Sequence, residues 1–599
     1  MFQIFTYFGV CEYISCSVCQ MPKQEGKELI PLNSLAGCKW WQIKVKESPV
    51  VVMSGEPSLE LAMDIYEETL SDFESLMSRD SEQKWLRKVS TTGTHSDQVS
   101  ALVTLCQMSP VLAMSHLRQL LNLAQVKANR IIEPALSAIK KLLVEELLPP
   151  DRKLMTFAEH KMPKVVYQTD LLLWYFEDFL KKLVATFVQI LFDSQTSPIE
   201  SIRTSCVDFS FDILCTIKAA HVAVEQEQPL LRLLVKALGD KAEKRVSAKA
   251  ALFLRKLAER RPHLKERIIE EVKDEHLVHL EEQTNDQSYT RGVNLACSLF
   301  TSFPLNKQDD AFVAGKMVGI LSVFVHNIIS KKEQRDKKRK LESTCGLSEA
   351  DAKILRYCLR ALESCIGIAG SDSPIPETTN ALLIRLSHET SLPGLSVAIL
   401  NFLSRVSQEL KTDSPKLVRA IYGQCGNIAV FVGGNQLAWI LSLIKEAVLE
   451  DPFVKESTRM AFRRRLMQVA SCVVEPSVLP VVLALTEPKQ LEVQLISENL
   501  CEEGPTTSHQ FGYNPNFWDP VTTNVESEPT VWERHLLKHH FDETVRLASD
   551  SMPVEVPDEA KSLTQLLIDV STMELPGEKK KKKSKISLED AEVEMPGFS

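Results

Sequence analysis

The stretch from Leu171 to Arg261 constrains the fold most, because it carries the same pattern twice. In each half an apolar helical run ends at an aspartate, Asp193 or Asp240, and a short polar turn follows. A second amphipathic run then begins around Ile202 or Val246, and their separation falls within the roughly 40–47-residue period of HEAT and armadillo repeats. One helical hairpin cannot bury its apolar face alone, so such hairpins stack on their neighbours. The sequence therefore predicts an all-α fold, a HEAT/armadillo-like α-solenoid.

The glycine content agrees with a helical chain. Only 21 of 599 residues are glycine, below the usual share of about 7%, so few positions demand a positive φ angle. Helical patterns recur from about residue 97 to residue 486, with proline, glycine or asparagine in most of the gaps. The net charge of −9 is mild for this length, so any binding of nucleic acid must come from local basic patches.

Changes of pattern along the chain mark its expected domains. We divide it into an irregular N-terminal segment (1–56), a helix and linker (57–95), the α-solenoid (96–500), a C-terminal extended motif with helices (501–575), and a charged, disordered tail (576–599). The linker STTGTHSD ends in Ser96-Asp97, which suits the N-cap of the next helix. The N-terminal segment contains a Trp40-Trp41 pair, which is either a packed tail or a docking element.

Motifs of catalysis and of cofactor binding are missing from the sequence. It has no phosphate-binding glycine loop, no H-E-x-x-H and no nucleophile elbow, so we expect neither an enzyme nor a cofactor nor a small-molecule substrate. Cys16 and Cys19 form a C-x-x-C pair without the second pair that a structural zinc site needs. His276 and His279 share a helix face, for which a solvated helix edge is the better interpretation than a metal site.

The longest uncharged apolar runs, 183–192 and 317–329, are shorter than the roughly 20 residues that a membrane-spanning helix requires. We therefore interpret them as buried helices and expect no membrane contact. Aromatic residues in 174–187 recur at helical spacing, and Phe176, Leu180 and Phe187 trace one stripe. Stacking on RNA bases is one interpretation of these rings, but core packing is the better one. An aspartate in place of Leu180 is expected to cost several kcal/mol.

Three basic clusters are candidates for contact with phosphate. The run 331–340 is either a solvated loop, a phosphate contact or an import signal, whereas three adjacent arginines at 463–465 exceed what solubility requires. Such binding is sequence-blind, and each neutralised phosphate adds about 0.7–0.9 to the log–log salt slope. The RNA candidates are Lys331, Lys332, Arg335, Lys337, Lys338, Arg339, Lys340, Arg459, Arg463, Arg464 and Arg465. The tail lysines Lys579, Lys580, Lys581, Lys582, Lys583 and Lys585 are predicted to form a nuclear-import signal.

Several segments together resemble a known family. The sequences LLPPDRKL (147–154), LLWYFEDFLKK (172–182) and EQEQPLLRLLVKALGD (225–240) closely resemble the CCAAT-binding-factor domain. Weaker similarities follow in order at 396–406 and 459–470, and then at Tyr513, Pro515, Trp532-Glu533 and Phe541. The order is similar to that of the type that includes nucleolar complex protein 1 and CCAAT/enhancer-binding protein zeta, and the resemblance covers about 85–580.

The resemblance implies a non-enzymatic assembly factor of the large (60S) ribosomal subunit. It implies a nucleolar or nuclear protein that binds pre-rRNA in the pre-60S particle and pairs with a homologue of nucleolar complex protein 2. The residues alone indicate only a large helical scaffold, which would act through many weak contacts. The alternatives are a transcription regulator that binds CCAAT-type promoters, for which no helix-turn-helix, zinc finger or basic zipper is evident, and a transport-receptor-like helical carrier.

Overall fold

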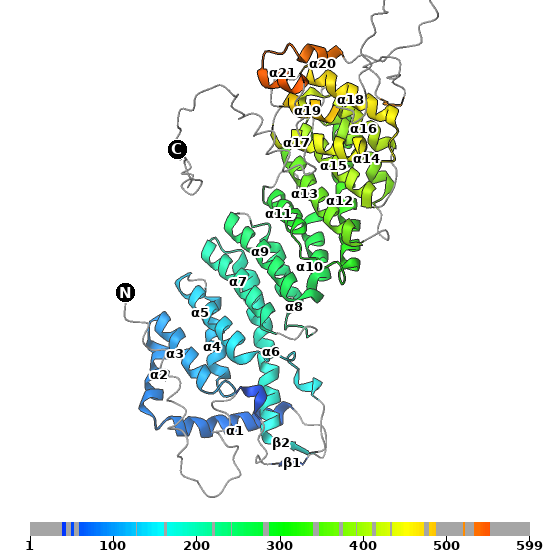
Figure 1. The fold of residues 1–599 in the computed structure, drawn as a ribbon. Coiled ribbons are helices and arrows are strands. Elements are labelled where there is room, and N and C mark those ends of the chain that lie inside the picture. Colours follow the sequence, from blue (N-terminus) through cyan, green and yellow to red (C-terminus); the bar gives the residue numbers. More distant parts are fainter. Residues whose placement is uncertain are drawn as a thin grey trace, which may run out of the picture. The chain divides into compact units, whose positions relative to one another are not determined.

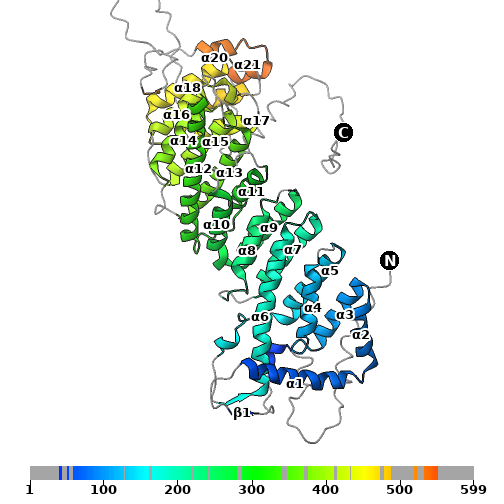
Figure 2. The same ribbon diagram turned by 180° about the vertical axis from the view of Figure 1, so that it is seen from behind.

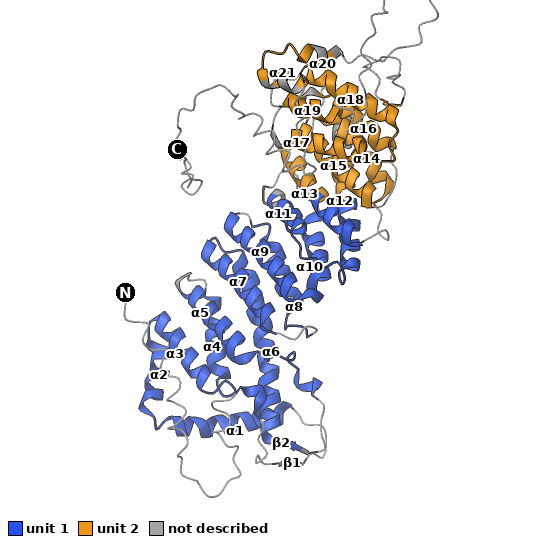
Figure 3. Ribbon diagram, in the orientation of Figure 1, with its two compact units in different colours: residues 1–324, 360–369 blue, residues 325–359, 370–599 orange. Residues whose placement is uncertain are grey.

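The computed structural model describes residues 39–43, 50–52, 59–126, 129–160, 165–217, 222–240, 242–278, 287–339, 347–369, 375–390, 392–409, 415–431, 434–472, 478–486, 519–521 and 532–550. These residues are helical apart from turns and two short strands, and their helices stack as hairpins, so the predicted fold class is confirmed. The chain forms two compact units, which the sequence analysis did not predict (Figure 3). Unit 1 comprises residues 1–324 and 360–369, and unit 2 comprises residues 325–359 and 370–599.

Most helices of unit 1 come from the N-terminal half of the chain. Its α-helices are α1 (Leu59–Met77), α2 (Ser81–Thr92), α3 (His95–Met108), α4 (Met114–Gln125), α5 (Asn129–Leu142), α6 (Gln168–Gln195), α7 (Glu200–Thr216), α8 (Glu227–Ala237), α9 (Lys244–Arg260), α10 (Lys265–Val272) and α11 (Gln287–Thr301). Short 3-10 helices lie at η3 (Trp40–Gln42), η5 (Phe157–Glu159) and η6 (Pro262–Leu264). The helices α5 and α10 end in single π-helical turns, η4 (Leu143–Leu147) and η7 (Lys273–Leu277).

The unit boundary falls within two helices, α12 (Ala311–Arg339) and α13 (Glu349–Ala369). Unit 2 then contains α14 (Glu377–Glu389), α15 (Pro393–Glu409), α16 (Pro415–Cys425), η9 (Ile428–Phe431), α17 (Gly434–Ile444) with its π-helical end η10 (Lys445–Leu449), α18 (Glu456–Ala470), α19 (Val478–Thr486), α20 (Trp532–Leu537) and α21 (Glu543–Asp550). In this unit α14, α16, α18 and α20 contact one another in order, and α15, α19 and α21 pack against α14, α18 and α20 (Figure 2).

Within unit 1 the helices from α4 to α11 form two layers. One layer runs α4, α6, α8, α10 and the other runs α5, α7, α9, α11, with each helix in contact with the next (Figure 1). The hairpins α4–α5, α6–α7 and α8–α9 join the layers. This arrangement follows from the duplicated pattern, because the apolar stripe of each helix can be buried only against its neighbours.

The buried residues of the duplicated stretch confirm its predicted core. Phe176, Leu180 and Phe187 are fully buried on α6, and Ile202 and Val246 are 1% exposed at the equivalent positions of α7 and α9. The rings of this stripe therefore pack in the interior, as expected, and are not free to stack on bases.

An ion pair links the two repeats where the sequence placed their turns. Arg203 Nε donates to Asp240 Oδ2 at 2.8 Å, and both side chains are almost completely buried. The other oxygen of Asp240 accepts hydrogen bonds from the backbone amides of Ala242 and Glu243, just before α9 begins. The same carboxylate thus satisfies backbone donors at the start of α9 and pairs with the preceding hairpin.

Some local expectations near the N-terminus are wrong. The segment 57–95 holds two helices, and the expected linker is mostly helical: α2 continues to Thr92 and α3 begins at His95. The N-cap of α3 is Thr94, whose hydroxyl accepts a hydrogen bond from the Asp97 amide at 3.4 Å, so Ser96 and Asp97 are already helical. A short antiparallel pair also joins β1 (Val50–Val52) to β2 (Val165–Tyr167).

One helical window in the described part of the chain is long and apolar enough to cross a membrane. It is Ala311–Ser330 in α12, with a mean hydropathy of 1.7, and half of it is buried inside the protein. Core helices of soluble proteins pass the same test, and Met317, Leu321 and Val325 are buried here. The prediction that this run lies in a helix with a buried apolar side is therefore confirmed, whereas the absence of membrane contact stays a prediction.

Candidate nucleic-acid interface

The first two segments that carry the family resemblance meet at Glu177, a carboxylate that is 1% exposed. Both terminal guanidinium nitrogens of Arg152 donate to its two oxygens, Nη2 at 2.9 Å, and the Met155 amide donates to Oε1 at 2.7 Å. Trp40 completes this junction, because its Nε1 donates to the Leu147 carbonyl at 2.8 Å and its ring is buried. Of the two interpretations of the tryptophan pair, the structure supports the packed tail for Trp40.

The third segment reaches the same junction through Glu225. This side chain is buried, and burial raises the pKa of its carboxyl against the opposing effects of Lys153, Lys181 and a hydrogen bond from the Leu154 backbone. The segments most typical of the family therefore meet around buried carboxylates. The Glu177 carboxylate is paired with Arg152 of the same chain, so this part of the junction is structural.

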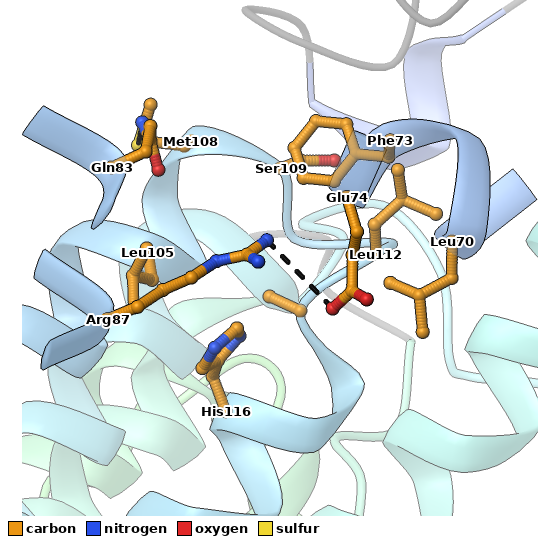
Figure 4. A pocket seen from close by; sticks show the side chains of 11 residues that line it. Leu70, Phe73, Glu74, Gln83, Arg87, Leu105, Met108, Ser109, Leu112 and His116 are labelled. Carbon is orange, nitrogen blue, oxygen red and sulfur yellow. Dashed lines mark hydrogen bonds and ion pairs between the residues drawn. The ribbon is translucent and has the colours of Figure 1, made fainter. Parts of the chain in front are cut away.

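A small cavity lies where α1, α2, α3 and α4 meet (Figure 4). Its volume of about 20 Å³ is enough for roughly one water molecule. Glu74 and Arg87 approach to 3.9 Å across it, and His116 lies beside them. Burial lowers the pKa of His116, and the nearby Arg87 cation adds to this effect. The cavity is too small for a cofactor or a small-molecule substrate.

The arginines of α18 point mainly to partners within the protein. Arg459 and Arg463 each donate to Glu456 at 2.8 Å from one helical turn or two turns away. Arg464 pairs with Glu533 of α20 at 3.2 Å, with side-chain exposures of 6% and 0%. Burial of Arg464 argues against the prediction that it contacts RNA, because a buried guanidinium cannot reach a phosphate outside the protein.

Arg465 is equally buried, and its guanidinium lies 4.3 Å from the centre of the Tyr422 ring. Gly426 makes room for it, since a Cβ there would lie 2.9 Å from Arg465 Nη2. The same argument therefore removes Arg465 from the RNA candidates. Contact of Arg459 and Arg463 with RNA stays a prediction.

The basic run after Ser330 has a different backbone from the one expected. The alternative of a solvated loop is wrong for residues 331–339, because α12 continues through Arg339. Lys340 and the tail lysines 579–585 lie outside the described residues. RNA contact and nuclear import stay predictions for these positions.

Helix α9 is also basic, although its basic residues do not form a long run in the sequence. α9 contains six basic residues and one acidic residue, and Lys244, Arg245, Arg255, Lys256 and Arg260 are exposed. The signal was present in the sequence, but it was divided among apolar residues because the helix also packs in the array. A count of charge over each helix, instead of over each run, would have found it.

Metal chemistry gains no support from the part of the chain that the structure describes. No group of three or more His, Cys, Asp or Glu side chains lies there in a position to hold an ion. His276 is buried and its Nε2 lies 2.8 Å from the Val235 carbonyl, so its interpretation as part of a solvated edge is wrong. His279, Cys16 and Cys19 lie outside the described residues.

Comparisons with known proteins agree with the resemblance seen in the sequence. Residues 396–549 match the model of the CBF/Mak21 family. The mouse protein named CCAAT/enhancer-binding protein zeta is 24% identical over 465 residues, 74% of this chain and 40% of that protein. The ribosome biogenesis protein NOC1 of Chaetomium thermophilum is 25% identical over 441 residues, 68% of this chain and 41% of that protein. This chain thus spans about two fifths of the length of these relatives.

Solved structures of importin beta also align with the chain. One covers 72% of this chain and 58% of its own, at 13% sequence identity and a TM-score of 0.33, which is too low to support an argument. The class of protein is defined by the helices themselves, as a protein of stacked helical hairpins without a recognised catalytic motif. Residues 396–549 match the CBF/Mak21 family model, so the resemblance predicted from the sequence is confirmed for this region.

Proposed function

We propose that this protein is a non-enzymatic scaffold of ribosome biogenesis that acts in early nucleolar assembly of the large (60S) subunit. The observation that carries the proposal is the CBF/Mak21 domain in a chain that is similar, over 68% of its length, to a protein named as a ribosome biogenesis factor. Because this chain spans about two fifths of that relative, the relative's role is transferred here as a proposal.

The proposed mechanism is multivalent holding of pre-rRNA. Stacked hairpins present many helix ends and faces over a long array, so several weak phosphate contacts can act together and raise the effective concentration of separate RNA segments. The proposed contacts lie at two places. One is the C-terminal end of α12, with Lys331, Arg335 and Arg339, and the other is the half-buried pair Arg459 and Arg463 of α18. Each would act through charge, without reading the base sequence.

The proposal also includes a binding partner of the protein and its location in the cell. We expect the chain to pair with a homologue of nucleolar complex protein 2 in the pre-60S particle. The tail lysines 579–585 are proposed to direct the protein to the nucleus, and binding to pre-rRNA would then concentrate it in the nucleolus.

Crosslinking in living cells tests the proposal. The tagged full chain would be crosslinked to nucleic acid by ultraviolet light and purified under denaturing conditions. Its bound RNA and bound DNA would then be sequenced separately, with an uncrosslinked sample as the control. Reads on large-subunit precursor rRNA, together with sedimentation of the protein in pre-60S fractions, are expected. Binding to CCAAT-containing promoters without rRNA would replace the proposal with the transcriptional alternative that the names of the zeta relatives suggest. Absence of both RNA and promoter signals would also overturn it.

A further inference from the structure

Helix α9 carries the excess of positive charge introduced above. Its sequence has six basic residues against a single glutamate, in a chain whose net charge is −9. It lies in the layer α5, α7, α9, α11 and packs on α7, α8 and α11. Its inward side is formed by Val246, Ala250, Leu254 and Leu257, all of which are buried.

The neighbouring acids neutralise only part of this charge. Lys249 pairs with Asp208 of α7 at 2.7 Å, and Arg255 pairs with Glu259 of its own helix at 3.3 Å. The guanidinium of Arg260 lies over the ring of Phe211. Lys244, Arg245 and Lys256 are exposed and make no ion pair within the described part of the chain.

Helical spacing gathers the exposed cations on one side of α9. Arg245 and Lys256 are separated by about three helical turns, which places them on the same face roughly 16 Å apart along the axis. Lys244 and Arg255 repeat this spacing one residue earlier. Leu252, which is 46% exposed, lies on the same face as Arg245. The face therefore presents two pairs of cations with a small apolar contact between them.

Helix stability does not explain the first pair. Lys244 and Arg245 occupy the first turn of α9, which holds no acidic residue. The helix dipole disfavours cations at this end, where its own partial charge is positive. Two unpaired cations at an electrostatically unfavourable position suggest an anionic partner that is absent from the free chain.

We propose that the exposed face of α9, formed by Lys244, Arg245, Leu252, Arg255 and Lys256, binds the sugar–phosphate backbone of RNA. This proposal rests on the proposed function and gives it a particular contact surface. Phosphate recognition needs cations at spaced positions and no apolar pocket. Protein interfaces are depleted of lysine and enriched in aromatic residues, so RNA fits this face better than an acidic protein does.

The test measures RNA binding by the purified full chain. A fluorescein-labelled, mixed-sequence RNA oligonucleotide serves as the probe, and its affinity is followed by fluorescence anisotropy over a range of salt concentrations. The variant Lys244→Gln/Arg245→Gln/Lys256→Gln removes three exposed charges from α9. The control Lys88→Gln/Lys236→Gln/Lys307→Gln removes three exposed charges from separate places in unit 1.

The α9 variant is expected to lose about two units of log–log salt slope, because each phosphate contact on single-stranded RNA contributes about 0.7. Its affinity at low salt should fall at least about tenfold, whereas the control should keep most of both quantities. Exchange of the three residues for the other cation, Lys244→Arg/Arg245→Lys/Lys256→Arg, should preserve binding. Unchanged melting by circular dichroism would show that the variants fold.

Two results would overturn the proposal. One is equal binding by the wild type and the α9 variant, and the other is an equal loss in the α9 variant and the control. If the α9 variant binds RNA normally but no longer retains a protein that copurifies with the wild type, the face is a protein-binding surface. The crosslinking experiment in cells distinguishes this proposal from the proposed function. If the α9 variant still crosslinks to rRNA, the proposed function holds but α9 is not the contact.

Discussion

Helices α9 and α18 are both basic, yet their cations have opposite environments. α9 in unit 1 has six basic residues and one acidic residue, and α18 in unit 2 has four arginines and one glutamate. In α18 two arginines are buried, against Glu533 and Tyr422, and the other two contact Glu456. In α9 the cations at both ends face outward. Net charge of a helix therefore does not indicate whether the charge is available to a partner.

The spacing of the cations explains the difference. Successive residues of a helix point about 100° apart, so Arg463, Arg464 and Arg465 cannot all face solvent when α18 packs on α16, α19 and α20. Arginine also suits this inward position, because its planar guanidinium can pair and stack when buried. In α9 the cations recur after three turns, so they stay on one face while the opposite face packs.

The largest effect is expected from Arg464. Arg464→Met removes the positive charge beside the buried carboxylate of Glu533, which should destabilise unit 2 by about 3–5 kcal/mol. Urea unfolding followed by circular dichroism measures the change. The matched double variant Arg464→Met/Glu533→Leu should recover most of this loss, because both charges of the pair are then removed. A single variant as stable as the wild type would contradict the burial of this pair.

A smaller effect is expected from Arg465. Arg465→Ala removes the contact of its guanidinium with the Tyr422 ring, 4.3 Å away, and a buried cation–π contact contributes roughly 2 kcal/mol. Arg463→Ala serves as the control, since its partner Glu456 is 56% exposed and an exposed pair contributes at most about 1 kcal/mol. Thermal unfolding that ranks these two variants in the reverse order would exclude the structural role of Arg465.

The contrast also shows what the sequence could reveal. Helix positions followed from apolar periodicity and from prolines and glycines in the gaps. The run expected to end at Asp193 is α6, which ends at Gln195, and the run expected to begin around Val246 is α9, which begins at Lys244. The core stripe of α6 followed from the same periodicity. These are local properties, because the period of a helix is written in adjacent turns.

Contacts between distant residues could not be predicted in this way. Glu533, the partner of Arg464, is separated from it by 68 intervening residues along a chain with no local pattern that joins them. The contact between the rings of Trp40 and Phe176 also joins residues that are distant in the sequence. The run of arginines at 463–465 was therefore interpreted as exposed surface, although Arg464 and Arg465 are buried. The basic residues of α9 were not recognised, because they are dispersed along the helix.

The N-terminal end of α9 offers a further test of the difference between α9 and α18. Lys244→Glu/Arg245→Glu should stabilise the protein by about 0.3–1 kcal/mol per residue, because acidic side chains are favoured beside the positive end of the helix dipole. The same variant should bind the RNA probe more weakly. Lys256→Glu, far from that end, should weaken RNA binding without the gain in stability. Loss of stability in the first variant would mean that its lysine and arginine have structural partners, as in α18.

The smallest expected effect is the pH dependence of the α18 pair around Glu456. Burial acts to raise the pKa of this carboxyl, but Arg459 and Arg463 outweigh it, so the pKa is lowered in the folded protein. A carboxyl with a lowered pKa stabilises the fold above its unfolded value of about 4.3, and this contribution is lost as the pH falls through the folded value. Because the side chain is 56% exposed, the contribution should stay below about 1 kcal/mol. Glu456→Gln should therefore be slightly less stable than the wild type at neutral pH and equally stable in acid, as measured by urea unfolding at both pH values. If the Glu456→Gln variant is as stable as the wild type at neutral pH, the ion pairs of Glu456 with Arg459 and Arg463 do not stabilise the fold. These two arginines would then be available to bind RNA.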